Sequence, residues 1–257
     1  MQRTQTLTLA DAVVPRLNSD SRVASLARDL ALMVGFALFV GLCAQIALRT
    51  PWTTVPITMQ TYGVLVTGAT LGAARGGGSM AIYMIIGMIG MPIFAPGSDV
   101  VSGNWGGHFI LPWDGSHALL WNISSGGYIV GFILSAIVVG FLAEKLQWDR
   151  KPWAYFAMLL GAAVVYIPGL LWLGYLIDTN WIFPGTDTPL AEFITGGSTV
   201  DKTLGGGLYP FIVGDLMKLG LATLTLPLAW SLVGKLKGEN GDGQAASNVQ
   251  KPGDGSA

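Results

Sequence analysis

Two oppositely charged residues, Asp215 and Lys218, lie three positions apart in residues 207–230, a stretch that carries no other charge. In an α-helix this spacing places both side chains on one face. An ionised Asp only accepts hydrogen bonds and a Lys ammonium only donates them, so the pair could recognise a small molecule with N–H donors beside a carbonyl or carboxylate, such as a ureido ring. Alternatively, the two charges neutralise each other and only hold the fold, although a buried pair seldom stabilises more than apolar residues would.

The composition indicates that this pair lies inside a membrane. The chain has 257 residues, of which 51% are hydrophobic and only 11% are charged, and its mean hydropathy is +0.55. So few charges cannot solvate the surface of a soluble domain. Because a charge at membrane depth is costly unless it is paired or faces a wet cavity, an ionisable residue there marks a candidate site.

Six apolar runs predict an all-α integral membrane protein whose six transmembrane helices form a compact bundle, since about 20 residues cross the hydrocarbon layer. The runs are residues 30–48, 55–74, 79–94, 128–143 with a start several residues earlier, 153–177 and 207–233. If the last helix begins near Tyr209, with Pro210 in its first turn, Asp215 and Lys218 lie roughly 8 and roughly 12 Å along it. The pair is then expected in the outer half of the membrane, where a solute can reach it from outside.

The basic residues predict the side of the membrane on which the termini lie. Eleven of them fall on the side shared by both termini: Arg3, Arg16, Arg22, Arg28, Arg75, Lys145, Arg150, Lys151, Lys235, Lys237 and Lys251. The opposite side holds only Arg49 and Lys202, in loops that also carry acidic residues. By the positive-inside rule, both termini are expected to be cytoplasmic.

These features divide the chain into three segments. Residues 1–28 read as a cytoplasmic or interfacial N-terminal segment without the apolar core of a signal peptide, and residues 29–236 as the six-helix transmembrane domain. Residues 237–257, rich in Gly, Asn, Gln and Ser without periodicity, are expected to be a disordered cytoplasmic tail. Two long outer segments, 95–121 and 178–206, could cap the outer mouth of the bundle or be disordered connections.

Four motifs in order resemble the BioY family, the biotin-binding S components of energy-coupling-factor (ECF) vitamin transporters. They are the runs 55–61 (VPITMQT), 87–94 (GMIGMPIF), 125–131 (SGGYIVG) and 210–218 (PFIVGDLMK). The resemblance implies a substrate-binding protein of the bacterial cytoplasmic membrane that takes up biotin. It also implies a transmembrane T component and two ATPase subunits as possible partners, although uptake by the chain alone stays open. A transporter or channel for another small solute, such as a different vitamin, is the alternative.

The resemblance also implies which residues form the substrate site. Asp215 and Lys218 match the Gly-Asp-x-x-Lys motif that contacts biotin. Gly126, Gly127 and Tyr128 match a Gly-Gly-Tyr motif, in which the glycines either allow close approach to the ligand or only pack helices. Thr58, Gln60 and Thr61 match a further motif that either lines the pocket or only starts the second helix by hydroxyl capping.

The pattern departs from the family just before the Gly-Gly-Tyr motif, where this chain has residues 122–125 (NISS). Asn122 and Asn104 are therefore only weak candidates for a polar ligand contact. Ala37 and Gly41, four residues apart, approximate the small-residue face through which such subunits are thought to dock on a T component. Small pairs are also common in any membrane helix, so the sequence leaves docking at these residues undecided.

Other functions are disfavoured by what the sequence lacks. The two histidines, His108 and His117, form no zinc-binding pattern, so neither a metal nor an enzymatic activity is expected. No phosphate-binding glycine loop occurs, so any use of ATP must come from a partner. No cofactor is expected, and a net charge of −1 gives no attraction to nucleic acid.

Overall fold

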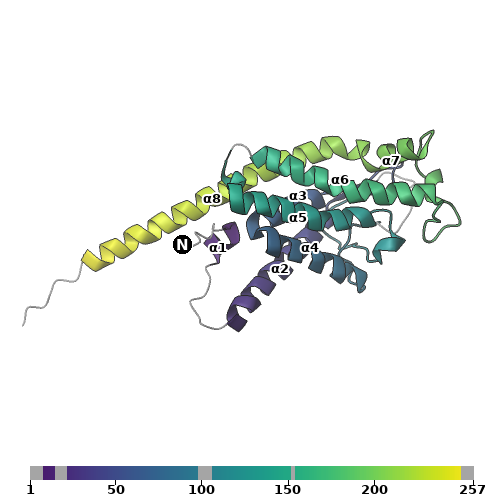
Figure 1. Ribbon diagram of the computed structural model, residues 1–257. Helices are drawn as coiled ribbons and strands as arrows, with labels where there is room; N and C mark the ends of the chain where they lie inside the picture. The colour runs from purple at the N-terminus through teal and green to yellow at the C-terminus, as the bar shows by residue number, and fades with distance from the viewer. Residues whose placement is uncertain (1–7, 15–21, 98–105, 152–153, 250–257) are drawn as a thin grey trace, which may run out of the picture.

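The computed structural model describes residues 8–14, 22–97, 106–151 and 154–249 (Figure 1). Its α-helices are α1 (Leu9–Val13), α2 (Arg22–Gln45), α3 (Gln60–Leu71), α4 (Ala73–Met88), α5 (Gly126–Leu146), α6 (Ala154–Asp178), α7 (Thr199–Gly207) and α8 (Ile212–Val249). Short 3₁₀ turns are η1 (Leu120–Asn122), η2 (Trp148–Arg150), η3 (Leu190–Glu192) and η4 (Tyr209–Phe211). The strands are β1 (Ala47–Arg49), β2 (Ile57–Thr58) and β3 (Gly106–His108).

Four helical stretches in the described part of the chain are long and apolar enough to cross a membrane: Arg22–Gln45, Gly126–Leu146, Ala154–Asp178 and Thr199–Lys235. They correspond to the first, fourth, fifth and sixth expected spans. The second and third expected spans correspond to α3, of 12 residues, and α4, of 16 residues. At 1.5 Å per residue α3 is only about 18 Å long. It is shorter than the apolar run because residues 57–58 form a strand and Gly72, at φ 86°, ends the helix.

The prediction of an all-α chain did not include a small antiparallel sheet, whose strand order is β2-β1-β3. Ala47 pairs with Thr58 on one side and with His108 on the other. Strands of two or three residues leave almost no periodic signal, which is why the apolar runs concealed them. The sheet joins the end of α2 to the start of α3, and it brings the described part of the outer segment 95–121 beside them.

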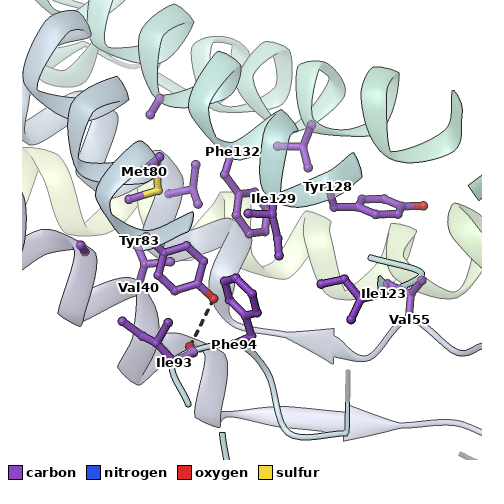
Figure 2. Close-up of a cluster of buried hydrophobic side chains, with 14 of the residues drawn as sticks. Val40, Val55, Met80, Tyr83, Ile93, Phe94, Ile123, Tyr128, Ile129 and Phe132 are labelled. Carbon is purple, nitrogen blue, oxygen red and sulfur yellow. Dashed lines mark hydrogen bonds between the residues drawn. The ribbon is translucent and has the colours of Figure 1, made fainter. Parts of the chain in front are cut away.

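The bundle is built around α5, which packs against α3, α4 and α6. Glycines allow these helices to approach closely: a Cβ added to Gly68 of α3 would lie 2.7 Å from the carbonyl oxygen of Ala136 in α5. Such contacts between small residues are typical of packing in membranes, where lipid provides no hydrophobic drive for helices to associate. The main buried cluster includes Tyr83, Phe94, Ile129 and Phe132 (Figure 2).

Large apolar side chains remain exposed on the outside of this bundle. Leu30, Leu42, Phe156, Leu171 and Leu224 are each between 44% and 71% exposed. A surface of this kind suits lipid rather than water. Ala37 and Gly41 do not belong to it: Ala37 is fully buried, and a Cβ at Gly41 would collide with Ile93. The docking face considered at these two residues is therefore occupied by the chain's own core.

The helix α1 lies at the end of the bundle toward which α8 extends, and α7 lies at the opposite end (Figure 1). Ion pairs among four charged residues join α1 to α2 and α4. Asp11 accepts from Arg28 and Arg75 at 2.9 Å each, and Asp29 pairs with the same two arginines. Burial alone would raise the pKa of Asp11, but hydrogen bonds from Arg75, Thr8 and Arg28 outweigh it and hold that pKa well below its usual range.

The outer segment 178–206 is folded. Phe183, Leu190 and Ile194 form a buried cluster with Leu173 and Leu176 of α6, and residues 199–207 form α7. Within the segment 95–121, described from 106 onward after Gly97, the backbone of Ser116 pairs with that of Phe94. The described parts of both segments are therefore ordered, and they are not disordered connections.

The helix α8 continues to Val249, past the boundary at residue 236 that the composition suggested. Residues 237–249, expected to be disordered, are thus helical, and residues 250–257 lie outside the described residues. A lack of hydrophobic periodicity indicates the lack of a packed face, and it does not exclude local helix.

Candidate ligand-binding site

Asp215 and Lys218 form a buried ion pair near the start of α8. Lys218 Nζ lies 2.8 Å from Asp215 Oδ1, and the two residues are 6% and 7% exposed. The structure places Pro210 in η4 and begins α8 at Ile212, so Asp215 lies in the first turn rather than the second. There the positive end of the helix dipole stabilises a carboxylate.

Tyr166, which was not predicted as a site residue, is a second hydrogen-bond partner of Asp215. Its hydroxyl donates to Asp215 Oδ2 at 2.5 Å, so a residue of α6 shares the carboxylate with a residue of α8. Tyr166 is half-buried, and it is two residues from Pro168, in the middle of the α6 run. A hydroxyl at mid-membrane depth was the signal that could have identified it, since a buried polar group needs a partner.

A pocket opens beside this triad of Asp215, Lys218 and Tyr166. Its empty space, including the part open to solvent, is about 550 Å³. The lining combines a few polar side chains with apolar and aromatic ones: Val55, Pro56, Thr58, Gln60, Thr61, Phe94, Ala95, Ser125, Tyr128, Ile129, Phe132, Val165, Tyr166, Phe211 and Lys218. Lys218 and Tyr166 line the pocket, and Asp215 lies behind them.

Aromatic rings form one side of the pocket. The ring of Tyr128 meets that of Tyr166 edge to face, with centroids 6.0 Å apart, and lies 6.5 Å from that of Phe211. The Tyr128 hydroxyl points away from this group and donates to the carbonyl oxygen of Gly207 at 2.8 Å. Tyr128 therefore links the pocket to the end of α7. Figure 2 shows Tyr128, Ile129 and Phe132 projecting from α5.

Thr58, Gln60 and Thr61, at the start of α3, supply the polar side of the pocket. Thr58 lines the pocket, and its hydroxyl also accepts a hydrogen bond from the backbone N–H of Gln60, the first residue of α3. Gln60 Oε1 accepts from the Thr58 hydroxyl, and its Nε2 donates to the Tyr83 hydroxyl at 2.6 Å. These bonds fix the Gln60 amide in the pocket wall.

Besides Asp215, which lies behind Lys218 and Tyr166, three expected site residues lie away from the pocket lining. Gly126 and Gly127 begin α5, where a Cβ at Gly126 would meet the Leu120 carbonyl and one at Gly127 would meet the Pro168 carbonyl. The packing alternative therefore describes both glycines. Asn122 is exposed in η1, because the short 3₁₀ turn directs it outward. Asn104 lies outside the described residues.

The site can hold a small, mostly apolar molecule by a polar end. The carboxylate of Asp215 balances the ammonium of Lys218, so the triad carries no net charge, and Lys218 still offers N–H donors to the pocket. In a low-dielectric wall such donors bind a carbonyl or carboxylate more strongly than they would in water. Within the described residues no cluster of three or more potential metal ligands occurs.

Helices long and apolar enough to cross a membrane thus enclose a part-polar pocket. The comparisons with known proteins specify the class. A model of the BioY family matches residues 16–235, and the chain therefore belongs to the BioY family.

Several curated relatives carry the same family name. The probable biotin transporter BioY of Pyrococcus horikoshii is 27% identical over 198 residues, which are 77% of this chain and 93% of the relative. That of Methanothermobacter thermautotrophicus is 34% identical over 166 residues, 62% of this chain and 84% of the relative. The biotin transporter BioY of Thermotoga maritima is 28% identical over 173 residues, 66% and 78% of the two chains.

A solved structure has the same fold. It is the S component for biotin from an ECF-type ABC transporter, with a TM-score of 0.58 and 18% identity. The match covers 83% of this chain and 95% of that one.

Proposed function

We propose that the protein is a biotin transporter that captures biotin from outside the cell in the pocket beside Lys218 and passes it across the membrane. Membership of the BioY family supports the substrate, and the names of the curated relatives agree with it. The observation that carries the proposal is that a buried, paired Lys218 lines a pocket whose wall combines apolar and aromatic side chains with polar ones. An intramembrane charge in such a place is expected to serve a ligand.

The chemistry of biotin fits this lining. Its sulfur-containing ring and its aliphatic chain are apolar and would rest on Ile129, Phe132 and Phe211. Its ureido carbonyl and its carboxylate are acceptors that suit the N–H groups of Lys218. Asp215 would act through its neighbours, because its oxygens hold Lys218 and Tyr166 in place.

The orientation in the membrane follows from the positive-inside rule. We place the ion-paired end that carries α1 in the cytoplasm, together with both termini, and α7 on the outer side of a bacterial cytoplasmic membrane. In this arrangement α3 and α4, joined at Gly72, act as the second and third of six spans, with their flanking residues completing the crossing. Residues 29–236 then form the transmembrane domain.

A T component and two ATPase subunits are the proposed partners for driven transport. The sequence has no phosphate-binding glycine loop of its own, and the solved structure with the same fold is a component of an ECF-type transporter. Release of biotin to the cytoplasm would require tilting or rearrangement of the bundle. Uptake of labelled biotin by cells that contain this chain without ATPase subunits would reveal transport by the chain alone.

Equilibrium binding to the purified protein tests the function. Labelled biotin is titrated into the detergent-solubilised chain, with unlabelled biotin, thiamine and riboflavin as competitors. We expect unlabelled biotin alone to displace the label. Displacement by thiamine or riboflavin, or the absence of biotin binding, would favour a transporter for another small solute.

A further inference from the structure

The carboxylate of Asp215 has a partner on each oxygen. Lys218 Nζ donates to Oδ1 at 2.8 Å, and the Tyr166 hydroxyl donates to Oδ2 at 2.5 Å. The ammonium of Lys218 and the hydroxyl of Tyr166 are thus both held by the one carboxylate of Asp215, each on its own oxygen. Both residues line the pocket.

The two groups keep opposite hydrogen-bonding capacities toward a ligand. An ammonium has three N–H donors, and in the part of the chain that the structure describes Lys218 uses one of them, on Asp215. A phenol has one donor, which Tyr166 commits to Asp215, and its oxygen is left as an acceptor. A hydrogen bond to a carboxylate polarises the hydroxyl and makes its oxygen a better acceptor.

We propose that Tyr166 is a specificity-determining residue, whose oxygen accepts a ureido N–H of the substrate while Lys218 donates to the adjacent ureido carbonyl. This inference rests on the proposed function. A ureido group places its carbonyl and its N–H next to one another, which matches the donor and the acceptor held by the one carboxylate of Asp215. Tyr166 then has two tasks, since it positions Asp215 and also contacts the ligand.

Other polar groups of the pocket are less suited to this task. Gln60 already accepts from Thr58 through Oε1 and donates to Tyr83 through Nε2. The Tyr128 hydroxyl donates to the carbonyl oxygen of Gly207, at the end of α7. Tyr166 alone among these groups shares a carboxylate with Lys218.

The test combines one substitution with one modified ligand. Affinities are measured for biotin and for two derivatives, each methylated at a different ureido nitrogen, in the wild-type protein and in Tyr166→Phe. The matched control is Tyr175→Phe, because Tyr175 lies on the same helix and is 59% exposed. Thermal unfolding of each protein checks that the fold is kept.

We expect Tyr166→Phe to weaken biotin binding about tenfold, the range of a hydrogen bond linked to a charged group. Methylation of one particular ureido nitrogen is expected to cost the wild type a similar factor but to cost the variant clearly less. Tyr175→Phe should behave as the wild type. A loss of the same factor for all three ligands would assign Tyr166 a structural role only and overturn the proposal, as would no loss.

If Tyr166→Phe fails to insert into the membrane, the affinities of the wild-type protein for the three ligands still test the proposal. Equal affinities for biotin and both methylated derivatives would overturn the proposal, because no ureido N–H would then be recognised. Discrimination against one derivative supports it. If the wild type binds no biotin at all, the proposed function itself fails, which is a different result from binding that is independent of Tyr166.

Discussion

Asp215 of α8 and Tyr166 of α6 are joined by a 2.5 Å hydrogen bond across the wall of the pocket. This contact makes the acidic residue a support for two pocket-lining groups, Lys218 and Tyr166. It also links two helices at the depth where the substrate is proposed to bind. The predictions below follow from this arrangement and from the packing around it.

Removing the charge of Asp215 should weaken biotin binding without unfolding the protein. In Asp215→Asn the amide keeps the size of the side chain but loses the charge-assisted hydrogen bonds to Lys218 and Tyr166. Such bonds are worth about 1.5–3 kcal/mol, so we expect a loss of at least about tenfold in affinity. Titration with labelled biotin measures it, and unchanged affinity would remove Asp215 from the site.

Removing the partner of Asp215 should affect stability as well as binding. Lys218→Met leaves a buried carboxylate unpaired, which costs about 3–5 kcal/mol. The double variant Asp215→Asn with Lys218→Met should regain most of the thermal stability but none of the biotin binding. If the double variant binds biotin as the wild type does, the pair serves only the fold.

The glycine at the start of α5 should be required for packing. In Gly127→Ala the new methyl group meets the Pro168 carbonyl and the Trp172 side chain, and overpacking of this kind costs about 1–3 kcal/mol. A lower unfolding temperature in detergent is expected. Gly220→Ala on α8 is the control, because a Cβ there has nothing within 4 Å, and a midpoint as low as that of Gly127→Ala would refute the packing argument.

The ion pairs of α1 should give a pH-dependent contribution to stability. The pKa of Asp11 is lowered in the folded protein, so its contribution is full above the unfolded pKa of about 4 and is lost as the pH falls toward the folded value. Asp11→Asn should therefore unfold at a lower temperature than the wild type at pH 7, and the difference should shrink below about pH 4.

The exposed Asp187 provides a control for this comparison. Asp187→Asn should match the wild type across the pH range, and neither variant should alter biotin affinity at pH 7. A constant difference between Asp11→Asn and the wild type at all pH values would contradict the role of the Asp11 carboxylate.

The fold was predictable where one strong signal dominates. The long apolar runs identified α2, α5, α6 and α8, because membrane helices need uninterrupted hydrophobic sequence. The short strands and the end of α3 at Gly72 were not predictable in this way. They depend on backbone pairing between β1 and segments distant in sequence, and on a positive φ, neither of which leaves a periodic pattern.

The site was predictable where charge stands out against apolar sequence. Asp215 and Lys218 were found for that reason, and the structure places them together beside a pocket. Tyr166 was missed because a tyrosine in a membrane helix is common, and only the approach of α6 to α8 gives it a partner. Gly126 and Gly127 looked like ligand contacts because sequence alone does not distinguish close helix packing from close ligand approach.

The most direct test of the account is a structure of the protein with biotin bound. We predict that biotin occupies the pocket, with an acceptor oxygen within about 3.2 Å of Lys218 Nζ and its rings against Tyr128 and Phe132. Biotin bound elsewhere on the protein, with Lys218 still paired only to Asp215, would contradict the central claim.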